Sequence, residues 1–456
     1  MSLTRRTFVS GASTLAFAGL LNIYTNKSFA ESNHRVKGYG PLLTDPNENL
    51  DLPEGFSYKI ISKMGDRMDD GYMVPDRADG MGCFALAGTQ VALVRNHEIG
   101  LDNYDPEMSK MQRSLLSVAY DMALDGLPLP GGTTTIVYDT KTGERVNEYR
   151  SLIGTIRNCS GGKTPWGSWI SCEEFVSSYG EVSILDHGWA FEVPAVGGSR
   201  FSRPLPLKGL GRFNHEGAAV DPSTGIVYMT EDRPNGLLYR FVPNVYGQLD
   251  KGGKLQAFGL MDRSKSADSR NWDGITFNQG DWHDAKWVDL DDIESPKDDL
   301  RLRGHEKGAV LFARGEGITW GDNEIYFCCT NGGVKGFGQI MRYKPSAKEG
   351  NSGENDEPGK LQLFLESDVR ELFSFGDNLT VAPNGHLIVC EDNYDHTANY
   401  IRGVTPEGAL YPLARLIGDS ETSGACFSPD GSILFVNIQS PTKTLAITGP
   451  WDKFSV

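Results

Sequence analysis

Residues 426–437 read CFSPDGSILFVN, which describes a strand, a tight turn at Pro429-Asp430-Gly431 and a second strand. Turn-forming residues between runs of alternating apolar residues are a strong signal for a β-hairpin. The same arrangement recurs five more times along the chain: residues 84–96 (FALAGTQVALVRN), 164–172 (TPWGSWISC), 218–230 (AAVDPSTGIVYMT), 318–329 (ITWGDNEIYFCC) and 379–390 (LTVAPNGHLIVC).

A single hairpin repeated at long, irregular spacing is typical of a β-propeller, whose blades keep a core of strands while their loops vary. Six hairpins predict an all-β fold, a six-bladed β-propeller. At about 45 residues per blade, part of the chain must form loop and short helical insertions. We expect these within residues 101–130, with a helical stretch over 111–122, in the polar region 251–304, and in a mobile loop over 347–360. A β-sandwich with added elements is the alternative.

The composition agrees with many short strands. The 456 residues include 54 Gly, and 10% are aromatic, which excludes a wholly disordered chain and disfavours helical bundles. Because no linker separates two segments of different amino-acid composition, we predict a single catalytic domain over residues 31–456.

The first thirty residues have the pattern of an export signal. Thr4-Arg5-Arg6-Thr7-Phe8-Val9 is a twin-arginine motif, an apolar stretch over 8–21 follows, and Ser28-Phe29-Ala30 offers a cleavage site. We therefore predict a twin-arginine (Tat) signal peptide over residues 1–30, the Tat export machinery as a partner, and a periplasmic or secreted mature protein. A different secretory signal or an uncleaved anchor is the alternative, and no later stretch is long enough for a stable membrane span.

The charge balance narrows the range of partners. The formal net charge is −16. Without the first thirty residues, the chain has 41 basic and 60 acidic residues. Such a surface repels nucleic acid and anionic membranes, so we expect neither as a partner. The acidity serves either solubility or the binding of hard cations.

Acidic residues recur at the same places in the hairpins. In a propeller the first strand of each blade lines the central channel, so residues at the starts of these strands converge on one channel mouth. Several carboxylates packed together need cations to neutralise them, and a thiolate among them favours a transition metal. The residues before the hairpins are Asp79, Cys159, His215-Glu216, Arg314 with Glu316, Asp377 and Glu421, and those after them are His97-Glu98, Glu173-Glu174, Glu231-Asp232 and Glu391-Asp392.

Each of these residues also has an ordinary interpretation, because acids beside turns commonly face solvent or cap the turn. His215 is expected to orient other groups rather than to bind a metal. Arg314 can form a simple ion pair with Glu316, or its guanidinium can bind phosphate if metals already neutralise the acids.

The seven cysteines differ in their surroundings. Cys172, Cys328, Cys390 and Cys426 lie in apolar strand patterns and are predicted to be buried, inert thiols. Cys159 lies beside the glycine-rich turn Ser160-Gly161-Gly162, which makes it the candidate ligand or nucleophile.

Several segments resemble the PhoX-type alkaline phosphatases. The most specific are residues 158–169 (NCSGGKTPWGSW) with Ser171-Cys172-Glu173-Glu174, and the segment that begins at Glu421. Further segments that fit are residues 187–189, 213–217, 231–233, 314–317, 377–379 and 448–451.

This resemblance implies a six-bladed propeller that hydrolyses phosphate monoesters at a channel-mouth site with two Fe3+, three Ca2+ and a bridging oxo group. It implies that Cys159 binds iron and that Arg314 binds the substrate phosphate, which makes both catalytic residues. The remaining metal ligands would be Glu173, Glu174, Glu216, Glu316, Asp377 and Glu421, with Asp392 as an alternative to Asp377.

The chain departs from the pattern in two respects: it is shorter than well-known members, and Ser440 stands where many relatives have His. The first difference leaves the range of substrates open. Two other functions therefore remain: a calcium-dependent propeller hydrolase of another ester or a lactone, and a propeller that binds a ligand without catalysis.

Overall fold

The computed structural model describes residues 35–103, 113–198, 201–262, 267–394 and 398–455. The expected signal peptide over residues 1–30 lies outside these ranges. The expected helical stretch over 111–122 is described from residue 113 onward, where it contains the short 3-10 helix η2 (Arg113–Leu115). None of the helices in the described ranges has the length and apolar character needed to cross a membrane.

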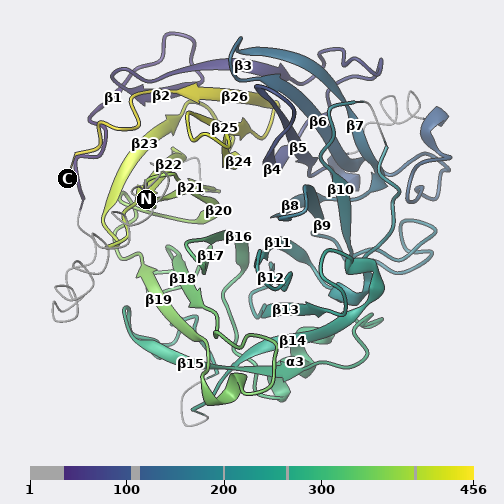
Figure 1. Cartoon of the computed structure of the whole chain (residues 1–456), viewed down its shortest axis with the longest axis vertical. Helices are drawn as coiled ribbons and strands as arrows, with labels where there is room; N and C mark the ends of the chain where they lie inside the picture. Colours follow the sequence, from purple (N-terminus) through teal and green to yellow (C-terminus); the bar gives the residue numbers. More distant parts are fainter. Residues whose placement is uncertain (1–34, 104–112, 199–200, 263–266, 395–397, 456) are drawn as a thin grey trace, which may run out of the picture.

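Antiparallel sheets are arranged radially around a central axis, as expected for a β-propeller (Figure 1). One four-stranded sheet consists of β4 (Ala78–Ala85), β5 (Gln90–His97), β6 (Gly131–Asp139) and β7 (Glu144–Thr155). A three-stranded sheet follows, with β8 (Asn158–Lys163), β9 (Ser168–Glu173) and β10 (Ala190–Pro194). In both of these sheets the strand that comes first in the chain, β4 or β8, lies nearest the axis (Figure 1).

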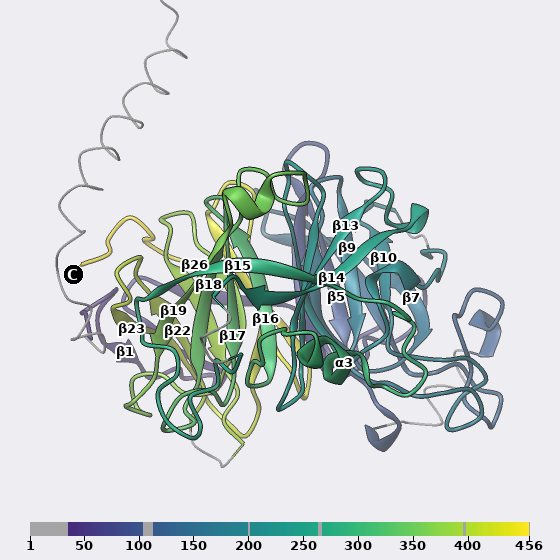
Figure 2. The same ribbon diagram turned by 90° about the horizontal axis from the view of Figure 1, so that it is seen from below.

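The next sheet departs from the expectation of six separate blades, because it has nine strands. Its two halves are joined at the outer rim by β15 (Trp282–Asp289), which pairs with β14 on one side and β19 on the other (Figures 1 and 2). The other strands are β11 (His215–Val220), β12 (Val227–Glu231), β13 (Leu238–Pro243), β14 (Gly253–Leu260), β16 (Gly315–Gly321), β17 (Glu324–Cys329), β18 (Gln339–Lys344) and β19 (Lys360–Glu366). The polar region 251–304 therefore supplies the joining strand, and the α-helix α3 (Leu300–Glu306) begins within it.

Two sheets combine the beginning and the end of the chain. The strands β20 (Gly376–Val381), β21 (Leu387–Glu391), β22 (Tyr400–Val404) and β23 (Leu410–Leu416) are extended by β1 (Leu42–Leu43) and β2 (Leu50–Pro53). The last hairpin strands, β24 (Thr422–Phe427), β25 (Ile433–Ile438) and β26 (Lys443–Thr448), are completed by β3 (Ser57–Lys63). The pairing of β3 with β26 closes the ring.

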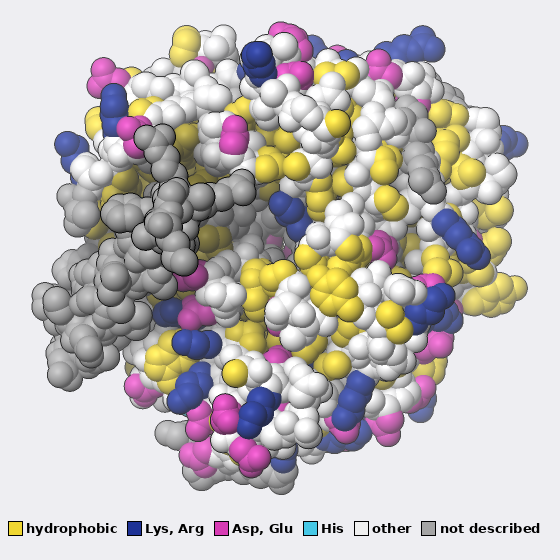
Figure 3. Space-filling view, in the orientation of Figure 1, with side chains coloured by type: hydrophobic (Ala, Val, Ile, Leu, Met, Phe, Trp, Pro, Cys, Tyr) yellow, Lys and Arg dark blue, Asp and Glu magenta, His cyan; other side chains and the backbone are white. Residues whose placement is uncertain are grey.

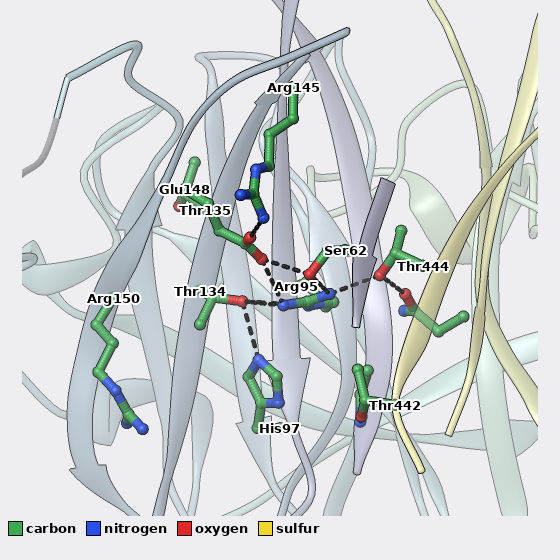
Figure 4. A network of polar contacts seen from close by, with 12 residues as sticks. Ser62, Arg95, His97, Thr134, Thr135, Arg145, Glu148, Arg150, Thr442 and Thr444 are labelled. Atoms are coloured by element: carbon green, nitrogen blue, oxygen red, sulfur yellow. Dashed lines mark hydrogen bonds and ion pairs between the residues drawn. The ribbon is translucent and has the colours of Figure 1, made fainter. Parts of the chain in front are cut away.

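A buried polar network reinforces this closure (Figure 4). Arg95 on β5 forms an ion pair of 3.0 Å with Glu148 on β7 and donates a hydrogen bond of 2.6 Å to the Thr444 hydroxyl on β26. Ser62 on β3 donates to the same carboxylate at 2.6 Å. Because both charged groups are fully buried, removal of Glu148 would leave the Arg95 guanidinium buried without an opposite charge, whereas Glu148 also pairs with Arg145.

Six inner strands, β4, β8, β11, β16, β20 and β24, follow one another around the axis, and each contacts the next. Glycines permit their close approach. A Cβ atom on Gly80 would lie 2.6 Å from the Ser160 Cα atom, and one on Gly317 would lie 2.8 Å from the Asp377 carbonyl oxygen. The inner ends of the sheets are therefore held at backbone contact, which fixes the spacing of the side chains that they carry.

Hydrophobic clusters fill the space between neighbouring sheets, as in the group of Ile388, Leu413, Leu434 and Leu445. All seven cysteines are buried and free, which confirms the expectation for the four in apolar strands. The segment 347–360, expected to be a mobile loop, is instead tied to β13, because Glu349 forms an ion pair of 2.7 Å with the buried Arg240.

Candidate metal centre

An irregularity in strand pairing directs the predicted ligands toward the axis. In β16, Gly315 pairs with Cys329 and Ile318 with Phe327, so Glu316 and Gly317 together oppose one residue. Such a β-bulge bends the strand and re-aims its side chain. The same two-against-one pairing occurs at Asp79, Cys159, Glu216 and Asp377 on the other inner strands.

The inner strand β24 differs from the other five in the position of its bulge and of its acid. Its bulge lies one residue later, after Ser423, and its acid, Glu421, precedes the strand. Five inner strands thus present an acid or a thiol at the equivalent position, and the sixth presents Glu421 from the loop before it.

A second set of acids comes from the residues that directly follow the neighbouring strands. These strands end at His97, Glu173, Glu231 and Glu391, each paired with the first residue of an inner strand. Because successive side chains point to opposite sides, the next residue faces the cavity instead. The residues placed there are Glu98, Glu174, Asp232 and Asp392.

All residues of these two sets except Glu216 line a cavity of about 790 Å³. Its wall contains more carboxylates than guanidinium groups, so the site carries a strong negative charge. By contrast, acidic and basic side chains are interspersed over the face of the molecule in Figure 3. The charged and thiol groups of the cavity are Asp79, Glu98, Cys159, Glu174, Asp232, Glu316, Asp377, Asp392, Asp419, Glu421, Arg77, Arg157, Arg233 and Arg314.

Three groups of side chains have the spacing of metal ligands, with one donor atom from each residue within 4.8 Å of the others. Cys159 belongs to two of them, and Glu216 joins the second group to the third. The groups are Asp79, Glu98 and Cys159; Cys159, Glu174 and Glu216; and Glu216, Glu316 and Asp377.

The electrostatics of the cluster favour cations. Burial, and then the neighbouring carboxylates Glu174 and Asp377, raise the pKa of Glu216 well above its usual value. Burial and the charge of Asp79 do the same to the pKa of the Cys159 thiol. Both carboxylate oxygens of Glu216 and the Oδ1 atom of Asp79 are buried without a hydrogen-bond partner. A bound cation would supply the missing partner, so these residues fit a metal site.

Glu173, a predicted ligand, belongs to none of these three groups and does not line the cavity. It is fully buried, and its carboxylate accepts hydrogen bonds from His187 Nδ1 at 2.7 Å and from the Gly188 and Trp189 amides at 2.9 and 3.1 Å. A fourth bond comes from the Ile156 amide at 3.1 Å. These four donors occupy the oxygens that a metal would need.

Glu421 and Asp392 both line the cavity. Burial, and then the charge of Asp392, raise the pKa of Glu421 well above its usual value. Of the pair Asp377 and Asp392, only Asp377 belongs to a group with ligand spacing. His215 lies away from the cavity, stacked on Phe213 with ring centroids 3.6 Å apart, in agreement with the expected supporting role.

The predicted phosphate-binding residue, Arg314, lies in the cavity wall. Its Nε and Nη2 atoms donate to the two carboxylate oxygens of Asp232 at 2.7 and 2.8 Å. Nη2 also lies 3.0 Å from Glu316 Oε1. The ordinary ion pair with Glu316 is therefore present, together with a two-point contact to Asp232.

Sequence reasoning missed Arg157, which lies at the equivalent position one residue before β8. Arg157 and Arg314 have φ angles of 45° and 50°, a strained region for residues other than glycine. Arg157 Nη2 lies 2.7 Å from carboxylate oxygens of both Glu98 and Glu174. Asp79 and Glu98 lie beside their hairpins in the sequence but are not among the predicted ligands. All three could have been identified by aligning the six hairpins, because they occupy positions equivalent to those of predicted site residues in other hairpins.

Comparisons with known proteins identify the family of the chain. The profile of the alkaline phosphatase PhoX family matches residues 37–141 and 129–442, nearly the whole described chain. The chain belongs to the PhoX alkaline phosphatase family. The resemblance noted in the sequence is thereby confirmed.

Among solved structures, PhoX of Pseudomonas fluorescens in complex with vanadate, a transition-state analogue, has 18% identity and a TM-score of 0.68. The alignment covers 92% of this chain and 98% of that one, which confirms the all-β propeller fold. A gluconolactonase from Xanthomonas campestris has 11% identity and a TM-score of 0.40, with coverages of 91% and 99%. No curated protein sequence matches the chain.

Proposed function

We propose that this PhoX family member is a metal-dependent alkaline phosphatase that hydrolyses phosphate monoesters in the 790 Å³ cavity. The observation that carries the proposal is the position of Cys159, which shares ligand spacing with carboxylates on both sides. A thiolate among carboxylates is the donor set expected of a site that combines a transition metal with hard cations.

Cys159 is the proposed iron ligand, and the all-carboxylate group of Glu216, Glu316 and Asp377 suits calcium. Asp79, Glu98, Glu174 and Glu421 complete the proposed set. The counts of two iron and three calcium ions are carried over from the family resemblance. When bound, these cations would polarise the phosphoryl group and offset the negative charge that develops during hydrolysis.

We also propose that the nine-stranded sheet acts as two blades, which makes six in all. Support comes from its two inner strands, β11 and β16, each of which carries a bulged acid. Each of six blades then contributes residues to one centre.

The reaction breaks the ester P–O bond and forms a P–O bond to the oxygen of water, releasing inorganic phosphate and an alcohol. Arg314 binds the phosphate in this proposal. It must first give up its two-point contact with Asp232, whose geometry matches that of a phosphate edge. Cation binding near Asp232 and Glu316 weakens their hold on Arg314 and makes this exchange favourable.

Export by the twin-arginine route to the periplasm or the outside of the cell is part of the proposal. Its support is the motif Thr4-Arg5-Arg6-Thr7-Phe8-Val9. This route transports folded proteins, so the metals can be inserted before export. Changing Arg5 and Arg6 to Lys should retain the protein in the cytoplasm; normal export of that variant would exclude the route.

The direct test is metal analysis of the exported protein together with turnover of p-nitrophenyl phosphate. We expect iron and calcium in the protein and hydrolysis at alkaline pH. Protein that contains calcium but no iron, and that cleaves a lactone instead, would identify another propeller hydrolase. Absence of turnover on either substrate would favour a ligand-binding propeller.

The variant Glu216→Gln separates metal binding from folding. It replaces a buried carboxyl group, whose oxygens have no hydrogen-bond partner, by an amide that cannot become charged, so the metal-free protein should be at least as stable as the wild type. Calcium should then raise its melting temperature less than that of the wild type, because a ligand is missing. An unchanged response to calcium would remove Glu216 from the proposed site.

A further inference from the structure

Tyr394 is an unusual member of the cavity wall. Among the described residues that line the cavity, it alone is aromatic, and the others are charged, polar, cysteine or glycine. Its exposed fraction is 63%, although aromatic rings gain most of their stabilisation from burial. A ring left open inside a polar cavity is available to contact a bound molecule.

The ring lies beside the group proposed to bind phosphate. Arg314 Nη1 donates a hydrogen bond of 3.3 Å to the Tyr394 hydroxyl, and the Arg314 Cζ atom lies 5.8 Å from the ring centroid. The ring of Phe375 approaches in an edge-on geometry, with centroids 6.3 Å apart. An ester whose phosphate is held by Arg314 would therefore place its alcohol part within reach of Tyr394.

The backbone before Tyr394 is fixed by hydrogen bonds. The amide of Asn393 donates to Asn399 Oδ1 at 2.7 Å, and its side-chain oxygen accepts from the Ser374 hydroxyl at 2.9 Å. Asn399 in turn donates to the Ser420 carbonyl at 2.9 Å. These contacts fix the position of the residue from which Tyr394 follows, so the ring extends from an ordered point of the cavity wall.

The size of the cavity agrees with a substrate larger than a phosphate group. A volume of about 790 Å³ lies in the range that holds drug-sized molecules. A neutral planar group can stack on an aromatic ring, and a contact of this kind contributes about 1–3 kcal/mol for nucleic-acid bases.

We propose that Tyr394 determines leaving-group specificity, and that the preferred substrates are phosphate monoesters with a planar aromatic group close to the phosphate, such as aryl phosphates. The inference rests on the proposed phosphatase function. An alternative role for the ring is to orient Arg314 only, which would affect all phosphate esters equally.

The test compares two non-hydrolysable ligands, phenylphosphonate and methylphosphonate, by calorimetry with iron- and calcium-loaded protein. Wild type should bind phenylphosphonate more tightly. Tyr394→Ala should weaken phenylphosphonate binding about tenfold and methylphosphonate binding less than twofold. Tyr394→Phe should keep the preference, because it retains the ring and loses only the hydroxyl contact with Arg314. Tyr179→Ala is the matched control, since Tyr179 is 75% exposed outside the cavity wall.

Equal weakening of both ligands by Tyr394→Ala, or no weakening of either, would overturn the specificity role while leaving the phosphatase proposal intact. Failure of wild type to bind either phosphonate would contradict the phosphate site itself, and both proposals with it. The same preference should appear in kcat/KM for phenyl phosphate relative to glycerol 2-phosphate, lowered in Tyr394→Ala and kept in Tyr394→Phe.

Discussion

Glu173 and Glu174 are adjacent in the chain, but their side chains point into different surroundings. The carboxylate of Glu173 accepts a hydrogen bond of 2.7 Å from the buried His187, whereas that of Glu174 lines the cavity and shares ligand spacing with Cys159. The cause is the alternation of side chains at the end of β9. The pairs Glu231-Asp232 and Glu391-Asp392 divide in the same way, with only the second acid in the cavity wall.

Substitution of each acid should therefore have a different effect. Glu173→Gln should lower the free energy of unfolding of the metal-free protein by about 3 kcal/mol, because it leaves His187 and three amides with a weaker acceptor. Its metal content per folded molecule should be unchanged. Glu174→Gln should reduce metal content with little loss of metal-free stability. Urea denaturation and elemental analysis of both variants would check this, and the reverse pattern would refute it.

Replacement of Cys159 should remove iron selectively. In Cys159→Ala the thiolate donor is absent from both groups to which it belongs, whereas Glu216, Glu316 and Asp377 remain for calcium. We expect iron content and phosphatase activity to be lost and calcium content to persist in part. Cys83→Ala is the control, because Cys83 is a buried thiol packed in a hydrophobic cluster. Retention of iron in Cys159→Ala would show that the thiol is only packing.

Arg314 should be needed for substrate binding rather than for metal binding. Loss of its charge-assisted contacts in Arg314→Ala should lower kcat/KM about 100-fold with metal content unchanged. Arg314→Lys should recover only part of the loss, since lysine cannot make a two-point contact. Arg270→Ala, which breaks a partly exposed ion pair with Asp268, should leave kcat/KM unaffected. A loss of metal in Arg314→Ala would count against this role.

His187 should make stability depend on pH. Burial lowers its pKa, but Glu173 and Asp121, with oxygens 2.7 and 3.1 Å from the ring nitrogens, raise it to about 9. The unfolded chain releases this proton near pH 6.5. The stabilisation, about 3 kcal/mol, is therefore complete below pH 6.5 and is lost as the pH rises through 9.

The measurement is urea denaturation of metal-free protein between pH 6 and pH 10. Wild type should lose stability steadily over this range, whereas His187→Gln should be less stable at pH 6 and show a flatter profile. A wild-type profile that is flat between pH 6.5 and pH 9 would show that His187 is neutral in the folded protein.

Much of the fold and of the site could be predicted from local patterns. Turn residues between alternating apolar runs indicate hairpins wherever they occur, because hairpin geometry is decided within about a dozen residues. The repetition of acids beside those hairpins then predicts the channel-mouth cluster, including Cys159, Glu216 and Glu316. The PhoX resemblance, read from the segments around Cys159 and Glu421, is confirmed by the match over residues 37–442.

What only the tertiary structure decided depends on contacts between distant residues. The joining of two sheets through β15 requires pairing partners more than seventy residues apart in sequence, such as Trp282 and Gln362. Arg157 reaches the cavity because the strained turn before β8 directs it there, and Glu173 leaves it because four donors from neighbouring segments hold its carboxylate. The sequence alone determined which residue types the strand ends carry. Which of those side chains meet was decided by the bulges, the strand pairing and the closure of β3 on β26. The reason is that the direction of a side chain follows from its own backbone and from the strands with which that backbone pairs on folding.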